Sequence, residues 1–300
     1  MYLKLVLTAI FWGGTFIAGR VVSQQVSPFS AAFFRFIMAS LCLLLVIRLK
    51  EGRRPIPAKQ QLFPLFLLGL TGIFAYNYFF FKGLKLVDAG RASVIVAQNP
   101  IVIALLSAYF FKERLTPLRI LAILLSVSGA ALAITRGNPA SVFQGGLGVG
   151  ELYIFGCVAT WAAYSLLGKA VMRNLSPLHS VTHSVLIGTG LLLPFALIEG
   201  GIQAAPSYAW RAWAGLGYLA VFGTVIGFFW FYEGIQQIGA MKAGLFINFV
   251  PISAIIMAVV LLGEPMTWSL LIGGVLVISG VVLMNWSSAA DARPKSGGRV

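Results

Sequence analysis

Residues 72–100, GIFAYNYFFFKGLKLVDAGRASVIVAQNP, recur as residues 223–251, GTVIGFFWFYEGIQQIGAMKAGLFINFVP. Small residues and a proline keep their places at an offset of 151: Gly72 pairs with Gly223, Gly83 with Gly234, Ala89 with Ala240 and Pro100 with Pro251. Outside this stretch the same offset, or one of 149, pairs further residues of the same kind: Glu113 with Glu264, Thr116 with Thr267 and Trp12 with Trp161. A unit of this length is far longer than a solenoid period, so the chain consists of two fused copies of one unit.

The composition places both copies in a lipid bilayer. Of the 300 residues 59% are hydrophobic and 10% are charged, and the mean hydropathy is +0.92. This is more apolar surface than a soluble core of that size can hide. The net charge of +14 would suit nucleic acid, but the basic residues cluster between apolar runs and mark no groove with interleaved aromatics. We therefore expect the lipid bilayer and a small molecule as partners, and no nucleic acid.

Ten apolar runs are long enough to cross the hydrocarbon as helices, which takes about 20 residues. They lie at approximately 3–22, 29–49, 62–82, 90–111, 118–136, 150–171, 178–198, 211–233, 241–262 and 268–286. We expect an all-α membrane protein with ten transmembrane helices. Its parts are a first five-helix repeat over 1–137, a linker over 138–149, a second five-helix repeat over 150–286 and a disordered tail over 287–300.

The odd number of helices in each repeat predicts that the second repeat is inverted with respect to the first. With the amino terminus inside, segments on the inner side carry 15 Lys and Arg residues and those on the outer side carry six. One outer loop, with Lys82, Lys85 and Arg91, is more basic than this rule predicts. The sequence therefore predicts two inverted repeats around a central cavity, in a cell inner membrane, with both termini cytoplasmic.

Several short motifs resemble one family. They are Trp-Gly-Gly-Thr-Phe at 12–16, Arg35, Asn99-Pro100, Glu-Arg-Leu-Thr at 113–116 and Gly-Glu-Pro at 263–265. Together with the two five-helix halves, they are similar to the drug/metabolite transporter superfamily, EamA type, and resemble most the YddG-like exporters of aromatic and other bulky amino acids. The resemblance covers about residues 1–286. It implies ten helices in a basket around a central cavity, with the fifth and tenth helices at the periphery.

Polar and aromatic side chains in the middle of apolar helices mark the wall of a cavity, because such groups are costly against lipid. The candidates for substrate binding are Trp12, Thr15, Tyr76, Asn77, Tyr78, Gln98, Asn99, Trp161, Tyr164, Phe246 and Asn248. Gln98-Asn99-Pro100 is the strongest local signal, since Pro100 removes a backbone donor and frees a carbonyl near midspan. Such a break suits a substrate's ammonium group; the alternative is that Asn99 only satisfies the freed carbonyl. Pro100 and Pro251 are candidate hinges.

For five charged or titratable residues, the sequence allows either a structural or a functional role. Arg35 could attract a carboxylate, but a side chain that snorkels to the surface or caps a helix end explains it better. His179 and His183 could relay protons, yet His179 lies near the inner surface. Glu113 and Glu264 are expected to cap exposed helix amides. No Asp or Glu lies clearly at midspan, so proton coupling through a carboxylate has no evident candidate.

The sequence predicts a secondary transporter and not an enzyme. It would export bulky or aromatic amino acids, or similar small amphipathic metabolites, by alternating access. An exchanger of phosphorylated sugars or nucleotide-sugars would need several cations facing the cavity, and a lipid-modifying enzyme would need a catalytic cluster that is not evident. A passive channel for small metabolites stays open. Because Cys42 and Cys157 lie in apolar runs, no metal site or cofactor is expected. A monomer is the simplest assembly, with an oligomer left open.

Overall fold

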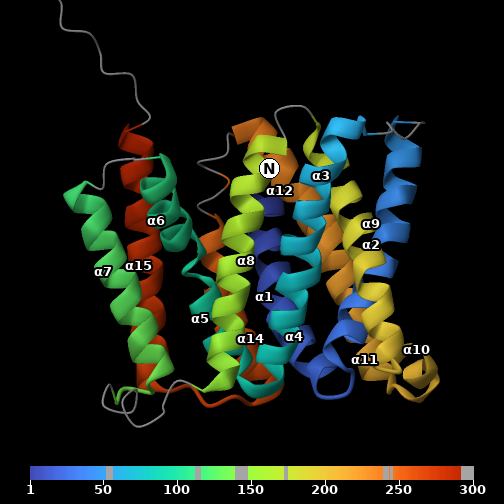
Figure 1. The fold of residues 1–300 in the computed structure, drawn as a ribbon. Helices are drawn as coiled ribbons and strands as arrows, with labels where there is room; N and C mark the ends of the chain where they lie inside the picture. Colours follow the sequence, from blue (N-terminus) through green and yellow to red (C-terminus); the bar gives the residue numbers. More distant parts are fainter. Residues whose placement is uncertain are drawn as a thin grey trace, which may run out of the picture.

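The computed structural model describes residues 1–51, 57–111, 116–138, 148–171, 175–238, 243 and 246–291. Within these ranges the chain forms helices and no strand. The helices stand side by side as a bundle, and the amino terminus and the end of the last helix both lie at the upper end in Figure 1. Glu113, most of the predicted linker at 138–149 and the part of the predicted tail from residue 292 lie outside the described residues.

The helices follow the two copies of the sequence unit. The first copy forms α1 (Tyr2–Ser23), α2 (Pro28–Glu51), α3 (Lys59–Leu68), the π-helical segment η1 (Gly69–Ala75), α4 (Tyr76–Leu86), α5 (Ala89–Val96), α6 (Asn99–Phe111) and α7 (Pro117–Ile134). The second copy forms α8 (Val149–Val171), α9 (Pro177–Ile198), the short α10 (Gly201–Ala204) and η3 (Ala205–Ser207), α11 (Trp210–Tyr218), the π-helical η4 (Leu219–Ile226), α12 (Gly227–Ile238), η5 (Phe246–Asn248), α14 (Phe249–Leu262) and α15 (Trp268–Asp291).

Eight continuous helical stretches of the described chain are long and apolar enough to cross a membrane. They are Tyr2–Ser23, Pro28–Leu49, Lys59–Leu86, Pro117–Ile134, Val149–Gly168, Leu178–Ile198, Trp210–Phe231 and Trp268–Trp286, and Phe249–Leu262 is a shorter apolar helix. The protein is thus a multi-pass membrane protein. The predicted span at 90–111 is divided between α5 and α6, and α15 continues to Asp291, beyond the predicted start of the tail at residue 287.

The break between α5 and α6 lies where the sequence predicts it. Helix α5 ends at Val96 and α6 begins at Asn99, so Pro100 falls in the first turn of the second helix. A proline is tolerated there because the first amides of a helix have no intrahelical partner. Pro251 likewise lies in the first turn of α14, directly after η5. Both candidate hinges therefore stand at the start of a helical segment; their movement stays a prediction.

Two threonines related by the offset of 151 begin two equivalent helices. The hydroxyl of Thr116 accepts a hydrogen bond from the amide of Arg119 at 3.4 Å, at the start of α7. Thr267 accepts one from the amide of Leu270 at 3.2 Å, at the start of α15. A side-chain oxygen at this position satisfies one of the free amides of the first turn. The two copies therefore begin their last helices by the same device.

Helices α7 and α15 pack against each other at one edge of the bundle (Figure 1). A Cβ atom on Gly129 would lie 2.6 Å from the carbonyl oxygen of Gly273, and one on Gly280 would lie 2.6 Å from that of Ala122. Glycine at these positions lets the two backbones approach, which is how small residues promote helix contact in membranes. The peripheral position that the resemblance implies for the fifth and tenth helices agrees with this arrangement.

Close contacts between the two copies recur at the positions that the sequence offsets pair. A Cβ on Gly72 would collide with the ring of Tyr164, and one on its counterpart Gly223 would lie 2.7 Å from Thr15 Cγ2, at the position equivalent to Tyr164. Both glycines lie in or beside a π-helical segment, η1 and η4. Helix α1 begins at the upper end of the bundle, whereas α8, the first helix of the second copy, begins at the lower end (Figure 1).

Candidate functional site

A chamber of about 660 Å³ lies between helices of both copies. Its volume falls in the range of roughly 300–1,000 Å³ that is typical of small-molecule sites. The structure brings nine of the predicted residues together on its wall: Trp12, Thr15, Tyr76, Asn99, Pro100, Trp161, Tyr164, Asn248 and Pro251. They come from α1, α4, α6, α8, η5 and α14. The chamber is therefore assembled from residues far apart in the sequence.

Aromatic rings form two groups on the chamber wall, one for each copy's tryptophan. Trp12 lies edge to face with Phe228, with ring centres 5.7 Å apart, and donates its Nε1 hydrogen to the carbonyl of Gly223 at 3.0 Å. Trp161 lies 5.4 Å from the ring of Tyr76 and 5.4 Å from that of Tyr164. Because the indole donor of Trp12 is satisfied and its ring is held by packing, this wall is pre-formed for an apolar or aromatic body.

Two amides offer polar atoms that the surrounding protein does not use. Asn99 Oδ1 and Asn248 Nδ2 are buried and have no hydrogen-bond partner among the described residues. Both side chains line the chamber, at the starts of α6 and α14. A buried polar atom without a partner is costly, so a ligand or water that reached these atoms would stabilise them. The Oδ1 acceptor of Asn99 in particular suits an ammonium group.

Four of the predicted substrate residues lie elsewhere. Gln98 bonds to Ser126 of α7, with its Nε2 3.1 Å from the Ser126 carbonyl and its Oε1 3.0 Å from the hydroxyl. Tyr78 stacks on Phe29 of α2 at 4.5 Å between ring centres. Neither side chain lines the chamber. The physical reason is that neighbouring residues of a helical segment point in different directions, so Asn99 and Tyr76 face the chamber while Gln98 and Tyr78 face other helices.

Phe246 and Asn77 also do not line the chamber. The ring of Phe246 packs beside Tyr2, 6.0 Å away between ring centres, although Asn248 of the same short η5 segment reaches the chamber. Asn77 is buried next to the wall, where its Nδ2 donates to the carbonyl of Ile73 at 2.9 Å and its Oδ1 accepts from Arg35 at 2.9 Å. Asn77 therefore holds the arginine that does face the chamber.

The structure corrects the interpretation of Arg35. This side chain neither snorkels to the surface nor caps a helix end; it is 8% exposed and lines the chamber. Its Nη1 donates to Asn77 and its Nη2 donates to Thr224 Oγ1 at 3.3 Å. The sequence signal for a functional role was a cation within an apolar run. Only the fold shows that this side of α2 faces the chamber. Arg119 also lines the chamber, from the first turn of α7.

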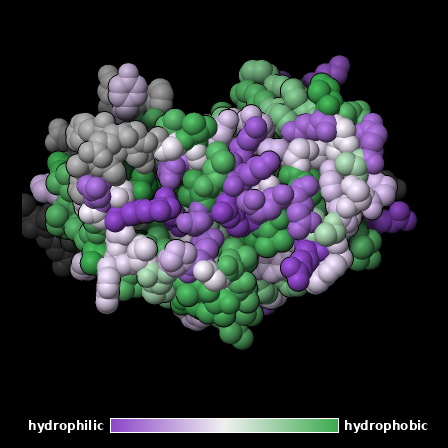
Figure 2. Space-filling model, turned by 90° about the horizontal axis from the view of Figure 1, so that it is seen from below, coloured by the Kyte–Doolittle hydropathy of each residue, from purple (hydrophilic) through white to green (hydrophobic). Residues whose placement is uncertain are grey.

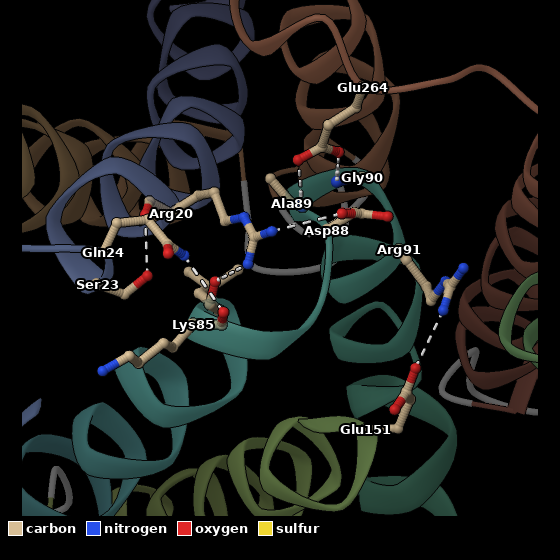
Figure 3. A network of polar contacts seen from close by, with 11 residues as sticks. Arg20, Ser23, Gln24, Lys85, Asp88, Ala89, Gly90, Arg91, Glu151 and Glu264 are labelled. Atoms are coloured by element: carbon tan, nitrogen blue, oxygen red, sulfur yellow. Dashed lines mark hydrogen bonds and ion pairs between the residues drawn. The ribbon is translucent and has the colours of Figure 1, made fainter. Parts of the chain in front are cut away.

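Charged residues tie together the helix ends below the chamber (Figure 3). Arg20 at the end of α1 donates to the carbonyl of Leu84 at 2.5 Å and lies 3.6 Å from Asp88. Arg91 of α5 pairs with Glu151 of α8 at 3.1 Å, and both side chains are largely buried. Seen from this side, hydrophilic residues form a band across the middle of the face, flanked by hydrophobic ones (Figure 2). The Arg20 contacts lie within the first copy, and the Arg91–Glu151 pair joins the two copies at the lower end.

Glu264 caps a helix, as the sequence predicts, but the helix belongs to the other copy. Its carboxylate accepts hydrogen bonds from the amides of Ala89 at 2.8 Å and Gly90 at 3.0 Å, at the start of α5 (Figure 3). A second carboxylate, Glu199 after α9, caps α2 by accepting from the amide of Ser30 at 2.9 Å. Negative charge at a helix amino terminus is stabilising. The sequence offered no signal for the role of Glu199.

The two histidines have local structural roles. His179 Nδ1 lies 2.7 Å from the hydroxyl of Ser176, at the start of α9, and His183 Nδ1 lies 2.8 Å from the carbonyl of His179. In the part of the chain that the structure describes, no group of three or more His, Cys, Asp or Glu side chains could hold a metal ion.

An apolar helical bundle around a chamber with aromatic and polar walls is the architecture of a membrane transporter. The chain belongs to the EamA-like transporter family of the drug/metabolite transporter superfamily, whose family model matches residues 1–135 and 148–286. The two matched regions are separate, with residues 136–147 between them. Membership in a transporter family is also consistent with the expectation that the protein is not an enzyme.

Relatives of known sequence match nearly the whole chain. The uncharacterized transporter YyaM of Bacillus subtilis is 30% identical over 94% of this chain and 92% of its own length. The probable terminal-alkyne amino-acid exporter of Streptantibioticus cattleyicolor is 28% identical over 97% and 95%. The uncharacterized inner membrane transporter YicL of Salmonella typhimurium is 26% identical over 97% of each chain. A protein of known crystal structure superposes with a TM-score of 0.65 at 20% identity, covering 96% of this chain and 98% of that one, and so shares the fold.

Proposed function

We propose that the protein exports bulky or aromatic amino acids, or similar small amphipathic metabolites, across a cell inner membrane. The observation that carries this proposal is the chamber wall, which combines the Trp12 and Trp161 aromatic groups with the unsatisfied amides of Asn99 and Asn248. An aromatic wall suits the side chain of such a molecule, and the amides suit its polar head group. The amino-acid exporter among the relatives supports the same substrate class, as does the resemblance to YddG-like exporters.

The proposal includes ten transmembrane helices in two inverted repeats. In this arrangement α5 and α6 together form the fourth span, and residues 241–262, of which residue 243, η5 and α14 are described, form the ninth. The opposite starting ends of α1 and α8 support the inversion (Figure 1), and so do the equivalent contacts of Gly72 and Gly223. Inverted repeats around a midplane site are the usual architecture of alternating-access transporters.

Alternating access requires that the chamber be closed at one end while it is accessible from the other. The ion pairs at the lower end, Arg20–Asp88 and Arg91–Glu151, support closure there. The excess of basic residues supports a cytoplasmic position of the amino-terminal, upper end. The described conformation would then be closed toward the outside, and Pro100 and Pro251 would be the hinges about which it changes.

A second candidate function rests on the two arginines of the wall. Arg35 and Arg119 both line the chamber, which suits an exchanger of phosphorylated sugars or nucleotide-sugars better than a single cation would. The two residues come from opposite ends of the bundle, since α2 begins at the lower end and α7 at the upper end (Figure 1). One phosphate group would therefore meet one arginine, and we favour the amino-acid class.

Transport by the purified chain in proteoliposomes tests the proposal. Vesicles preloaded with a large amino acid should lose it faster with the wild-type protein than without protein, and Trp12→Ala or Trp161→Ala should slow that efflux. Trp210→Ala is the matched control, because Trp210 is 73% exposed on the outside of the bundle and should change nothing. Efflux of glucose 6-phosphate alone would favour the second function, and failure with every large amino acid would exclude the first.

A further inference from the structure

Arg35 is a buried cation whose described partners are all neutral. It is the eighth residue of α2, about 10 Å along the axis from the start of that helix. It donates hydrogen bonds to the amide oxygen of Asn77 and the hydroxyl of Thr224, and its Nε has no partner among the described residues. A guanidinium has five N–H groups, so most of its capacity to donate remains unused.

No carboxylate of the described residues neutralises Arg35. The three ion pairs in the described part of the chain join other residues, and among the described residues that line the chamber none is Asp or Glu. The ring of Phe36 lies 4.9 Å from the Arg35 guanidinium and supplies a cation–π contact, which is weaker than an ion pair. Charges inside a membrane protein are normally paired, because an isolated one is costly. The structure therefore has a place for an anion next to Arg35.

The surroundings of Arg35 leave room for that anion on the chamber side. A Cβ atom on Gly223 would lie 3.7 Å from Arg35 Nη2 and 2.7 Å from Thr15 Cγ2. Gly223 thus packs closely against Thr15, and Arg35, Thr15 and Gly223 all line the chamber of about 660 Å³, which provides the space for an anion. The planar guanidinium presents pairs of N–H groups along its edges, which is the geometry that binds both oxygens of a carboxylate.

We propose that Arg35 binds the carboxylate of the transported molecule and thereby selects substrates that carry one. The inference rests on the proposed function and narrows its substrate class. With the carboxylate on Arg35 of α2, the apolar part of the molecule lies against the Trp12 and Trp161 groups. An ammonium group then has Asn99 Oδ1 as an acceptor on another part of the same wall.

Three small probes with the same phenyl ring but different head groups test which group Arg35 binds. Phenylalanine has a carboxylate and an ammonium group, 3-phenylpropionate has only the carboxylate, and phenethylamine has only the ammonium group. Binding to the purified full chain is measured by the shift of the thermal unfolding midpoint and by tryptophan fluorescence. Arg35→Gln should lower the affinity for both probes that carry a carboxylate, phenylalanine and 3-phenylpropionate, roughly 10- to 100-fold. This is the loss expected when hydrogen bonds to a charged group are removed. Phenethylamine should bind the variant no worse than the wild type.

Asn77→Asp distinguishes a ligand-binding arginine from one that only holds helices together. This variant places a carboxylate beside Arg35 Nη1, at the position where the amide oxygen lies 2.9 Å away. It should keep the fold at least as stable as the wild type, yet lose affinity for 3-phenylpropionate as Arg35→Gln does. Arg35→Lys should retain part of that affinity, because it keeps the charge but not the two-point geometry.

Several outcomes would overturn the proposal. They are a wild-type protein that does not bind 3-phenylpropionate, variants that bind it as well as the wild type, and equal losses for all three probes. The proposed function fails separately, when proteoliposomes export no amino acid. If binding of 3-phenylpropionate depends on Arg35 while amino acids are not exported, the carboxylate site stands and the amino-acid assignment does not.

Discussion

Arg91 of α5 and Glu151 of α8 form an ion pair, 3.1 Å between Nη1 and Oε1, that joins the first copy of the unit to the second at the lower end of the bundle. The sequence offsets identify the residues that would form the same pair at the other end. Arg91 corresponds to Lys242 and Glu151 to Tyr2; Arg20 and Asp88 correspond to Lys169 and Gly239. At the equivalent positions both basic residues are replaced by lysine, whereas both acidic residues are replaced by uncharged ones. The same two ion pairs therefore cannot form at the upper end. We therefore expect the ion pairs to favour closure at the lower end.

Loss of Glu151 should open the lower end. In a Cys42→Ala, Cys157→Ala background, Ser93→Cys places a thiol on the chamber wall. A membrane-impermeant thiol reagent added to the outside should label it faster after Glu151→Gln, about fivefold for loss of roughly 1 kcal/mol of a part-buried ion pair. The rate is measured on intact cells.

The matched control for this experiment is the ion pair at the upper end. Lys4 and Glu233 lie 2.8 Å apart between α1 and α12, so Glu233→Gln removes one carboxylate without touching the lower contacts. It should leave outside labelling of the thiol unchanged or slower. Equal acceleration by both variants would show that the lower ion pairs have no special part in closure.

Glu264 should stabilise the whole bundle through α5. Replacement by Gln removes the negative charge of a carboxylate that accepts hydrogen bonds from two backbone amides. We expect the free energy of unfolding to fall by about 1 kcal/mol. Thermal unfolding in detergent measures the change. Thr267→Ala, which removes the cap of α15 alone, is the comparison. An unchanged midpoint for Glu264→Gln would mean that the neutral amide caps α5 equally well.

Separation of α7 from α15 should destabilise the protein. Gly129→Leu introduces a side chain whose first carbon would lie 2.6 Å from the Gly273 carbonyl oxygen, and overpacking of this kind costs about 1–3 kcal/mol. The midpoint of thermal unfolding and the yield of folded protein should both fall. Gly217→Ala in α11 is the control, because nothing lies within 4 Å of a Cβ there. A well-folded Gly129→Leu variant would disprove the close contact.

Asn99 should discriminate between the head groups of the probes. Asn99→Ala removes the acceptor proposed for the ammonium group, so affinity for phenylalanine should fall about tenfold while that for 3-phenylpropionate stays the same. Titration by tryptophan fluorescence provides both values. Gln98→Ala is the neighbouring control, since that side chain bonds to Ser126. If Asn99→Ala lowered the affinity for both probes equally, Asn99 would instead contribute to the shape of the chamber wall.

Several features could be predicted from the sequence because their causes are local. Apolar runs of sufficient length predict helices in a bilayer wherever they occur, and the described spans lie close to the predicted ones. Pro100 lacks an amide hydrogen, so a break before it follows from that residue alone. Glu264, at the end of a helix and beside a turn, was expected to cap amides for the same kind of reason. Its target, α5, lies in the other copy and could not be predicted.

The sequence by itself determined the repeat, the membrane environment and the family, because hydrophobic length and residue spacing are properties of the chain. Only the tertiary structure decided which side of each helix meets the chamber. A rotation of one or two positions separates Asn99 from Gln98 and Tyr76 from Tyr78, and weak periodicity in an apolar helix does not specify that rotation. The same packing decided that Arg35 faces inward, because its direction depends on how α2 meets α4 and η4 through Asn77 and Thr224.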